Sequence, residues 1–542
     1  MKFQSFVDLY SKLYRLLGNV KFAVVIILIF SAYLTYGTFM ESYHGTDYAN
    51  RHVYKSVDFM FVQLLMFLSI LVATLQRLPL KRHLYGFYVI HLGLILIFLG
   101  SFITYQAGVD GNLTLAPNTA ARDVQLNEDQ LTIQLPEEGR EVSVALPYRA
   151  RGVDLGLEWE GIKVLRFLPF SELQTSWQED KLLDMTRQHS GTYRLENDNF
   201  GEDLTLSLHP EADFESTMQL GPLNVHYMPE LLAECFSKPS YKNLIIWDAQ
   251  RGSCFLPQDQ NIKEKKGMGG KNMIELKVGE RTLRFLPDLS PLPVDENLKL
   301  LDKAEHRIFS RALFQEKPHL FIFGRFASFF EKESQTWQVR DLKPGIDVAL
   351  PWMGFRLRLN RHETQSYPKR SPSEVKPIQD NGELIQGGLK AVEIEAAGSR
   401  FWVTTSQAMS LNRKEGRVIF ILGRKSLKLP FEITLDQFKM DTDPGTNNPA
   451  SYESFVTLFK GNQGSEKHHV FMNNPMKKEN FTFYQASYFQ TQEGPYGSVF
   501  SVNYDPGRPW KYLGSLLLVL GSIWHFVLRK KPARPTTEVA HA

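Results

Sequence analysis

The chain has 542 residues, of which 43% are hydrophobic and 22% charged, with a net charge of +3. This length exceeds one ordinary domain, and the composition excludes a disordered tail, a collagen and a small disulfide scaffold. The two cysteines form no Cys-x-x-Cys motif, which excludes an iron–sulfur cluster and a zinc ribbon within the chain, and the small net charge gives no argument for nucleic acid as a partner.

Four long apolar segments predict membrane-spanning helices. Nineteen uncharged residues separate Lys21 from Glu41, eighteen separate Asp58 from Arg77, and seventeen without lysine, arginine or acidic residues separate Lys511 from Arg529. A span needs about 20 apolar residues. We therefore expect a tail at 1–19, spans at 20–40, 57–76, 85–107 and 511–528, an external loop at 41–56, a cytoplasmic loop at 77–84, an exported domain at 108–510 and a tail at 529–542.

Basic residues predict the orientation of these spans. Lysine and arginine cluster at 2–21, 77–82 and 529–534, and with four spans all three clusters fall on one side. The excess of lysine and arginine on the cytoplasmic side of membrane proteins predicts that both termini are cytoplasmic. Residues 108–510 are then exported.

The sequence of the expected exported segment predicts mostly β-strands. Alternating or β-branched runs separated by polar turns lie at 131–135, 162–168, 203–209, 243–247, 355–360, 401–405, 417–422 and 451–459. An amphipathic helix is expected at 297–314 and an exposed loop at 262–271. The fold class is therefore an integral membrane protein with four transmembrane α-helices and a large β-rich exported domain between the third and fourth.

His91 is the most informative single residue. It lies about 10 Å into the third span, and an ionisable side chain at that depth is a functional candidate. Two interpretations remain open, an axial ligand of haem iron or a histidine bonded to a carbonyl of a neighbouring helix. His525 is a weaker candidate ligand, because it lies near the cytoplasmic end of the fourth span, where an interfacial residue is more common.

Small residues in the third span predict a packing face. Gly86, Gly93, Gly100 and Ala107 recur every seven residues, which places them in one stripe that lets another helix approach closely. Gly514 and Gly521 repeat this spacing in the fourth span. His91 points about 160° away from the stripe. We expect packing within the chain on the glycine face and His91 offered outward to a partner.

Cys235 and Cys254 lie nineteen positions apart in the exported segment. An oxidising compartment makes a disulfide between them plausible, with transient thiol exchange as the alternative. The eight histidines between 189 and 469 show no helical metal-site spacing, and we expect them at the surface.

Local stretches then indicate a family. They are YGTFMES and VYKSVDFMF around the first loop, HLGLILIFLGSFITYQAG in the third span, PGTNNPASYESFVTLF and VFMNNPMKKENFTFYQASY late in the exported segment, and YDPGRPWKYLGSLLLVLGSIWHF entering the fourth span. With these stretches and this layout, the chain resembles the ResB (CcsB) cytochrome c-type biogenesis proteins of System II. Residues 170–430 match weakly.

The resemblance implies a function in haem transport. Such proteins act with a CcsA/ResC-type membrane protein that bears a tryptophan-rich external segment, move haem from the cytoplasm to the outer side and present it to apocytochrome c for covalent attachment. This chain has no tryptophan-rich segment, so the partner is expected to be separate. His91 matches the family's third-helix haem ligand, so transient, non-covalent haem b shared with the partner is expected.

The same resemblance implies a bacterial inner membrane location, with the large domain in the periplasm or on the outer side. The chain would be a non-catalytic or co-catalytic subunit of a haem-attachment complex, and a thiol–disulfide reductant is a further candidate partner. Two other functions remain as alternatives, a membrane-anchored extracytoplasmic binding or sensing module and an accessory subunit of an envelope transporter.

Overall fold

The computed structural model divides the chain into two compact units, which are taken in turn. Unit 1 comprises Met1–Glu172 and Pro372–Ala542, and unit 2 comprises Leu173–Ser371. The chain leaves unit 1 within one strand, β5, and returns within another, β22. The structure describes residues 2–180, 188–266, 272–278, 281–286, 292–294, 299–301, 306–413, 416–445, 449–459, 465–492 and 494–528.

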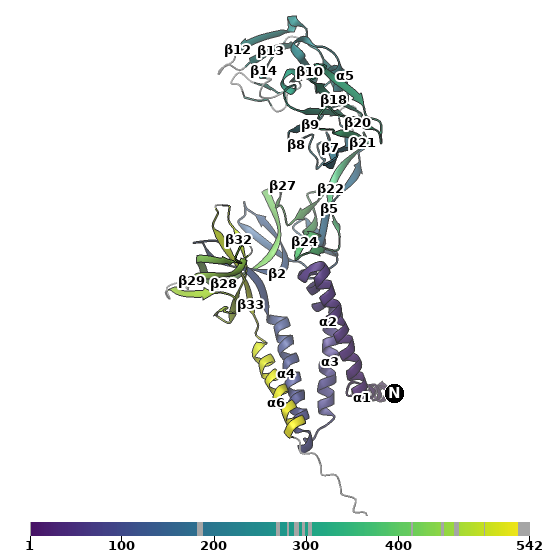
Figure 1. The fold of residues 1–542 in the computed structure, drawn as a ribbon. Coiled ribbons are helices and arrows are strands. Elements are labelled where there is room, and N and C mark those ends of the chain that lie inside the picture. Colours follow the sequence, from purple (N-terminus) through teal and green to yellow (C-terminus); the bar gives the residue numbers. More distant parts are fainter. Residues whose placement is uncertain are drawn as a thin grey trace, which may run out of the picture. The chain divides into compact units, whose positions relative to one another are not determined.

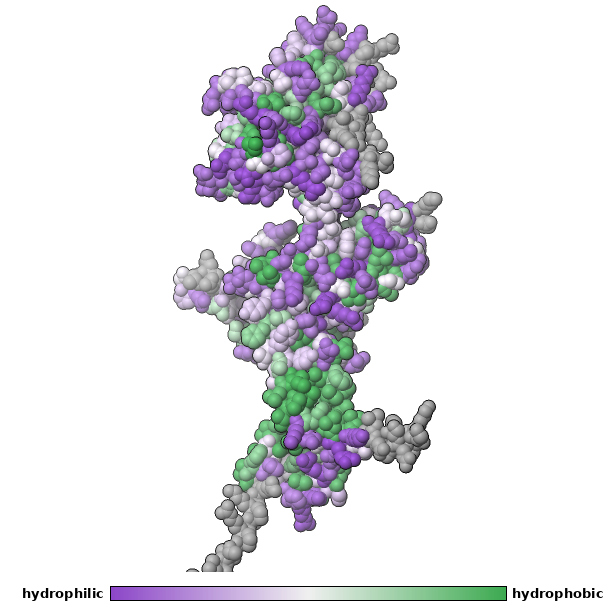
Figure 2. Space-filling view, turned by 90° about the vertical axis from the view of Figure 1, so that its right-hand side faces the viewer, coloured by the Kyte–Doolittle hydropathy of each residue, from purple (hydrophilic) through white to green (hydrophobic). Residues whose placement is uncertain are grey.

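Among the described residues, four helices of unit 1 are long and apolar enough to cross a membrane, which confirms the expected number of spans. Figure 1 shows them below the strands of this unit, and Figure 2 shows an apolar belt over them, with hydrophilic residues below it. The helices are α2 (Val20–Ala49), α3 (Val57–Leu75), α4 (Tyr85–Ala107) and α6 (Arg508–Ile523), which continues as the π-helix Trp524–Leu528.

The first span differs from its expected bounds. A helix, α1 (Lys2–Leu17), lies within the expected tail, and α2 runs past residue 40 and continues as the π-helix Asn50–Tyr54. Gly45, at φ +82°, interrupts the helical backbone. The expected loop 41–56 is therefore largely helical, because its polar residues pack against strands of the same unit, as described below. A short 3₁₀ helix, Arg82–Leu84, precedes α4.

Helix ends are set by side chains that the sequence places there. Asn19 accepts a hydrogen bond from the Lys21 amide at the start of α2, and Ser56 accepts one from the Phe59 amide at the start of α3. Pro509 lies in the first turn of α6, where no backbone donor is lost.

The largest sheet has ten strands and curls on itself. Its order is β30-β29-β28-β2-β1-β33-β32-β31, with β3 beside β2 and β27 beside β28. Val470 of β30 and Met476 of β31, at the two ends of this path, share one hydrophobic core. The strands are β1 (Val109–Leu115), β2 (Ala120–Leu135), β3 (Arg140–Ala145), β27 (Met409–Arg413), β28 (Gly416–Thr442), β29 (Pro449–Phe459), β30 (Ser465–Val470), β31 (Met476–Lys478), β32 (Phe481–Gln490) and β33 (Tyr496–Tyr504).

Two sequence stretches noted above build this curled sheet. Asn473 adopts φ +64° in the tight turn that joins β30 to β31, a conformation that asparagine tolerates. Gln485 lies at a β-bulge in β32 and hydrogen-bonds Ser454 and Ser498, both of which are fully buried. These motifs therefore have structural roles in closing and filling the sheet.

A smaller sheet completes unit 1. It has the order β22-β5-β25-β26, with β4 beside β5, and its core includes residues of β2 and β28. Its strands are β4 (Val153–Trp159), β5 (Ile162–Glu179), β22 (Ser366–Glu374), β25 (Leu389–Ala396) and β26 (Ser399–Thr404). A separate hairpin consists of β23 (Ile378–Asp380) and β24 (Glu383–Gln386).

The described residues of unit 2 form four small sheets. Two of them share one core, with the orders β20-β21-β6-β7 and β19-β18-β17-β9-β8. The others have the orders β11-β10-β16 and β12-β13-β14-β15. The strands are β6 (Ser190–Glu196), β7 (Gly201–Ser207), β8 (Thr217–Leu220), β9 (Leu223–Tyr227), β10 (Leu244–Asp248), β11 (Ser253–Phe255), β12 (Ile262–Lys266), β13 (Asn272–Val278), β14 (Arg281–Phe285), β15 (Pro293–Val294), β16 (His306–Ser310), β17 (His319–Phe323), β18 (Phe326–Glu331), β19 (Thr336–Asp341), β20 (Asp347–Ala349) and β21 (Arg356–Glu363).

The runs expected as strands all coincide with or overlap observed strands, whereas the expected helix at 297–314 is wrong in its described part. Residues 306–310 form β16, which pairs with β10 and buries Ile308 and Phe309, and 311–314 form a 3₁₀ turn. The expected loop at 262–271 begins instead with β12. Residues 267–271, 297–298 and 302–305 of these two segments lie outside the described part of the chain.

Candidate functional site

His91 lies on α4 with its imidazole half-buried and oriented by the helix itself. Its Nδ1 lies 2.9 Å from the backbone oxygen of Phe87. A carbonyl oxygen can only accept, so Nδ1 carries the proton and Nε2 keeps a free lone pair. Metal-binding histidines are commonly held in this way, with the second ring nitrogen donating to a carbonyl or carboxylate.

The Phe87 ring joins His91 to a positive charge. The two ring centroids are 3.7 Å apart, and the Arg77 guanidinium carbon lies 4.5 Å from the Phe87 centroid. Tyr88 donates a hydrogen bond of 2.6 Å to the backbone oxygen of Arg77, which ties the start of α4 to the end of α3. A free imidazole nitrogen and a guanidinium therefore lie at the same end of this helix pair.

The glycine face of α4 packs as expected, against α6. A Cβ placed on Gly93 would lie 2.6 Å from the backbone oxygen of Gly514, and one on Gly521 would lie 2.7 Å from the Ile90 nitrogen. These separations leave no space for a side chain. The spacing of glycines in both spans therefore specifies close packing of α4 on α6, which lie side by side in Figure 1.

The opposite face of α4 is covered in part by α3. At about 100° per residue, His91 falls within about 20° of Phe98 and Phe102 on the helix surface. Both phenylalanine rings contact Phe67 of α3. His91 itself contacts Phe87 of its own helix and is half-buried, so the expectation that it is offered outward to a partner stays a prediction.

His525 occupies a different position. It lies in the π-helix that ends the fourth span, and its backbone and Cβ are the nearest atoms to Gly86. Its Nδ1 is buried and has no hydrogen-bond partner among the described residues. Gly86 and His91 lie on different faces of α4, so the two candidate histidines are not brought together as a pair.

The Asp-Pro-Gly motif joins β33 to this helix pair. Asp505 follows β33 and accepts hydrogen bonds from Thr104 at the end of α4 and from Lys511 in α6, at 2.5 and 2.7 Å. Burial alone would raise the pKa of Asp505, but the bonds from Lys511 and Thr104 and the nearby positive charges hold it below its ordinary value. The ionised carboxylate therefore clamps both helices where they leave the apolar belt.

Sequence reasoning missed a buried charged cluster at the end of the first span, beside the strands of unit 1. Arg51 is fully buried and contacts Asp47 at 2.9 Å and Asp129 of β2 at 2.6 Å. Lys390 of β25 lies 2.7 Å from Asp129, and Tyr148 donates a hydrogen bond to Asp47. Burial and the charge of Asp47 raise the pKa of Tyr148, so the hydroxyl stays protonated. The cluster joins the first span to both sheets of unit 1.

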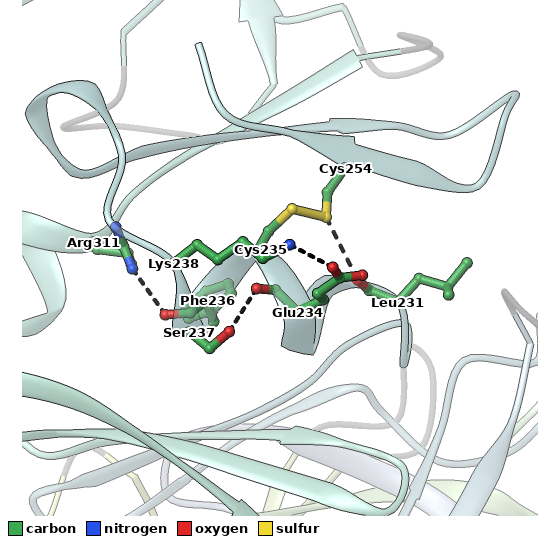
Figure 3. The surroundings of a disulfide bond; sticks show 8 residues. All are labelled: Leu231, Glu234, Cys235, Phe236, Ser237, Lys238, Cys254 and Arg311. Atoms are coloured by element: carbon green, nitrogen blue, oxygen red, sulfur yellow. Dashed lines mark hydrogen bonds and ion pairs between the residues drawn. A yellow bond between two sulfur atoms is a disulfide. The ribbon is translucent and has the colours of Figure 1, made fainter. Parts of the chain in front are cut away.

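In unit 2 the structure joins Cys235 and Cys254 in a disulfide (Figure 3). Cys235 lies on the short helix α5 (Leu232–Ser237), and Cys254 lies on β11, opposite Trp247 of β10. Arg311 donates a hydrogen bond of 2.8 Å to the Phe236 backbone oxygen from the other side of α5. The disulfide and this arginine fix a helix that is too short to be stable alone.

Comparison with known proteins gives a partial match. The model of the ResB-like family matches residues 396–496. Protein NrfI of Wolinella succinogenes is 33% identical over 106 residues, which cover 19% of this chain and 11% of that protein. The family match covers the Asn-Pro turn and the Gln-Ala-Ser-Tyr bulge of the curled sheet, whereas His91, Asp505 and the four spans lie outside it.

Proposed function

We propose that this chain is a ResB-type protein that acts as a haem-handling subunit of a cytochrome c biogenesis complex, and the match of residues 396–496 to the ResB-like family supports this proposal. In this proposal haem b is cargo held within the membrane and presented at the outer side to apocytochrome c. The chain acts with a separate membrane protein of the CcsA/ResC type. Its own contribution is to hold and orient haem, a positioning task, and the thiol addition takes place with the partner.

The orientation of His91 is the observation that carries this proposal. The Phe87 carbonyl fixes the imidazole so that Nε2 is free to bind iron as a neutral axial ligand. In this proposal the second axial ligand comes from the partner. Arg77 would supply a positive charge for a haem carboxylate at the same end of the helix pair.

The proposed location is the bacterial inner membrane, with both termini in the cytoplasm and the strands of both units outside. The basic clusters near residues 2–21, 77–82 and 529–534 support this orientation. A reporter active only outside the cytoplasm should work when fused at position 250 and fail when fused at the C-terminus. Activity at the C-terminus would contradict four spans.

An absorption spectrum tests the function itself. The complex of this chain with its co-expressed partner, purified in detergent, should show a Soret band near about 400–430 nm, as expected for ligated haem. A colourless complex would favour a binding or sensing module. Co-purification with an ATPase in place of haem would favour an accessory subunit of a transporter.

A further inference from the structure

Unit 2 contains a pocket of about 560 Å³ that the proposed haem function does not use. Its size falls within the range of about 300–1,000 Å³ that is typical of small-molecule sites. Strands β8, β9, β10 and β16 and helix α5 contribute to its wall. The pocket therefore lies wholly within one compact unit.

The inner wall of the pocket is apolar and rigidly held. Tyr227, Leu232, Trp247 and Phe309 line it, and each is at most 6% exposed. Leu232 belongs to α5, the helix fixed by the disulfide and by Arg311 (Figure 3). The disulfide therefore holds one wall of a preformed pocket, which lowers the cost of binding an apolar ligand.

The polar groups of the pocket favour an anion. Arg307 lines it and is exposed, and it has no ion pair with any described residue. No acidic side chain is among the described residues that line the pocket. His226 also lines it and lies 2.9 Å from His319, Nε2 to Nδ1. Burial and the neighbouring His319 lower the pKa of His226 to about 4, so Arg307 is the charged group at neutral pH.

The burial of two histidines in and beside this pocket contradicts the expectation that histidines of the exported segment lie at the surface. His226 is half-buried, and His189, which accompanies the pocket residue Tyr227, is 1% exposed. Both histidines pack against aromatic rings, and the residues involved are spread over more than a hundred positions of the chain. Their burial could not be derived from local spacing.

We propose that this pocket binds a long apolar carboxylate, such as a fatty acid or a lipid-derived acid, with the apolar chain against Trp247 and Phe309 and the carboxylate on Arg307. The apolar wall accounts for the chain and the unpaired guanidinium for the acid group. Ser216 and Thr217 supply further hydrogen-bonding groups in the lining. The proposal concerns unit 2 alone and does not depend on the haem function.

Photolabelling of the full chain in nanodiscs tests this assignment. The probe is a diazirine-bearing hexadecanoic acid, and its methyl ester serves as the neutral analogue. Mass spectrometry should locate labels in pocket peptides such as the one containing Met228 and Leu232. Labels in the membrane helices are expected in every sample and provide an internal measure of the probe concentration in lipid.

Two variants and one matched control complete the test. Arg307→Gln should lower pocket labelling by the acid by about tenfold, the loss expected for one charge-assisted bond, and leave the ester unchanged. Thr217→Trp, at an exposed position opposite His226, should block both probes. Arg340→Gln, an exposed arginine of the same unit outside the pocket lining, should change neither. Labels confined to the membrane helices, or equal pocket labelling in all variants, would overturn the proposal.

Discussion

Gly93 of α4 and Gly514 of α6 meet backbone to backbone, although 421 positions separate them in the chain. A Cβ on Gly93 would lie 2.6 Å from the Gly514 oxygen and 2.9 Å from the Leu518 nitrogen. Both neighbours are backbone atoms of a helix, so neither can move aside alone. This contact holds the span that carries His91 against α6.

Gly93→Leu should therefore force α4 and α6 apart. Overpacking of a close contact destabilises a protein by about 1–3 kcal/mol. Because the atoms that a new side chain would meet here are backbone atoms, we expect the loss of stability to lie at the upper end of that range. The thermal midpoint of the full chain in detergent should fall. Leu92→Phe, an enlargement at a neighbouring exposed position, is the control and should leave the midpoint unchanged. Equal thermal midpoints for the two variants would contradict this prediction, because they would mean that moving α4 and α6 apart does not destabilise the protein.

The buried cluster at the end of the first span leads to a second prediction. Asp129→Ala should leave Arg51 with Asp47 as its remaining close carboxylate and Lys390 without its nearest one. Breaking a buried pair costs about 3–5 kcal/mol, because an uncompensated charge stays buried. Hydrogen exchange of β2 and β25 amides should report a matching fall in the opening free energy.

The neighbouring residue supplies the control for this experiment. Glu128 pairs with Lys425 at the surface, and both side chains are about half exposed. Glu128→Ala should change the opening free energy by no more than about 0.5 kcal/mol. If Asp129→Ala behaves like Glu128→Ala, the buried cluster does not stabilise the contact between helix and sheets.

The disulfide in unit 2 is expected to stabilise the fold of that unit and to have no redox function. A loop of nineteen residues closed by Cys235 and Cys254 corresponds to about 3 kcal/mol in the chain-entropy description. Replacement of both cysteines by serine should weaken protection of α5 and β10 against hydrogen exchange, while cytochrome maturation continues. Loss of maturation in a double variant with normal protection would instead assign the pair a redox role.

The parts of this structure that sequence reasoning predicted depend on local patterns. A run of nineteen apolar residues, glycines at a seven-residue repeat and alternation in strands each carry their consequence within a short stretch of chain. The Cys235–Cys254 disulfide could be predicted because the chain has no other cysteine. The motifs VFMNNP and FYQASY were recognisable, but their roles as a turn and a bulge required the curled sheet.

The missed features depend on residues far apart in sequence. Arg51 and Asp129 are separated by 78 positions, and Thr104 and Asp505 by 401. The segment 306–314 has a helical pattern of apolar residues, but pairing of β16 with β10 overrides that local preference. The contacts of Phe67 with Phe98 and Phe102 likewise depend on the packing of α3 on α4.

The last prediction concerns the ligand itself. His91→Ala should remove the nitrogen that we propose binds haem iron and leave a gap about the size of an imidazole beside Phe87. The complex with the partner should lose most of its haem and fail in cytochrome maturation. Added imidazole should partly restore haem, because it can enter the gap and supply the missing nitrogen.

His525→Ala is the matched variant for this test. His525 packs against the Gly86 backbone on the α4–α6 side, away from the face that carries His91, so its loss should leave haem content nearly unchanged. Haem per complex is measured by pyridine haemochrome for both variants, with and without imidazole. Haem loss in both variants with no recovery in imidazole would indicate helix disruption and not loss of a ligand. Haem loss confined to His525→Ala would assign the ligand to the other histidine, because a free Nε2 on His91 would then have no function in haem binding.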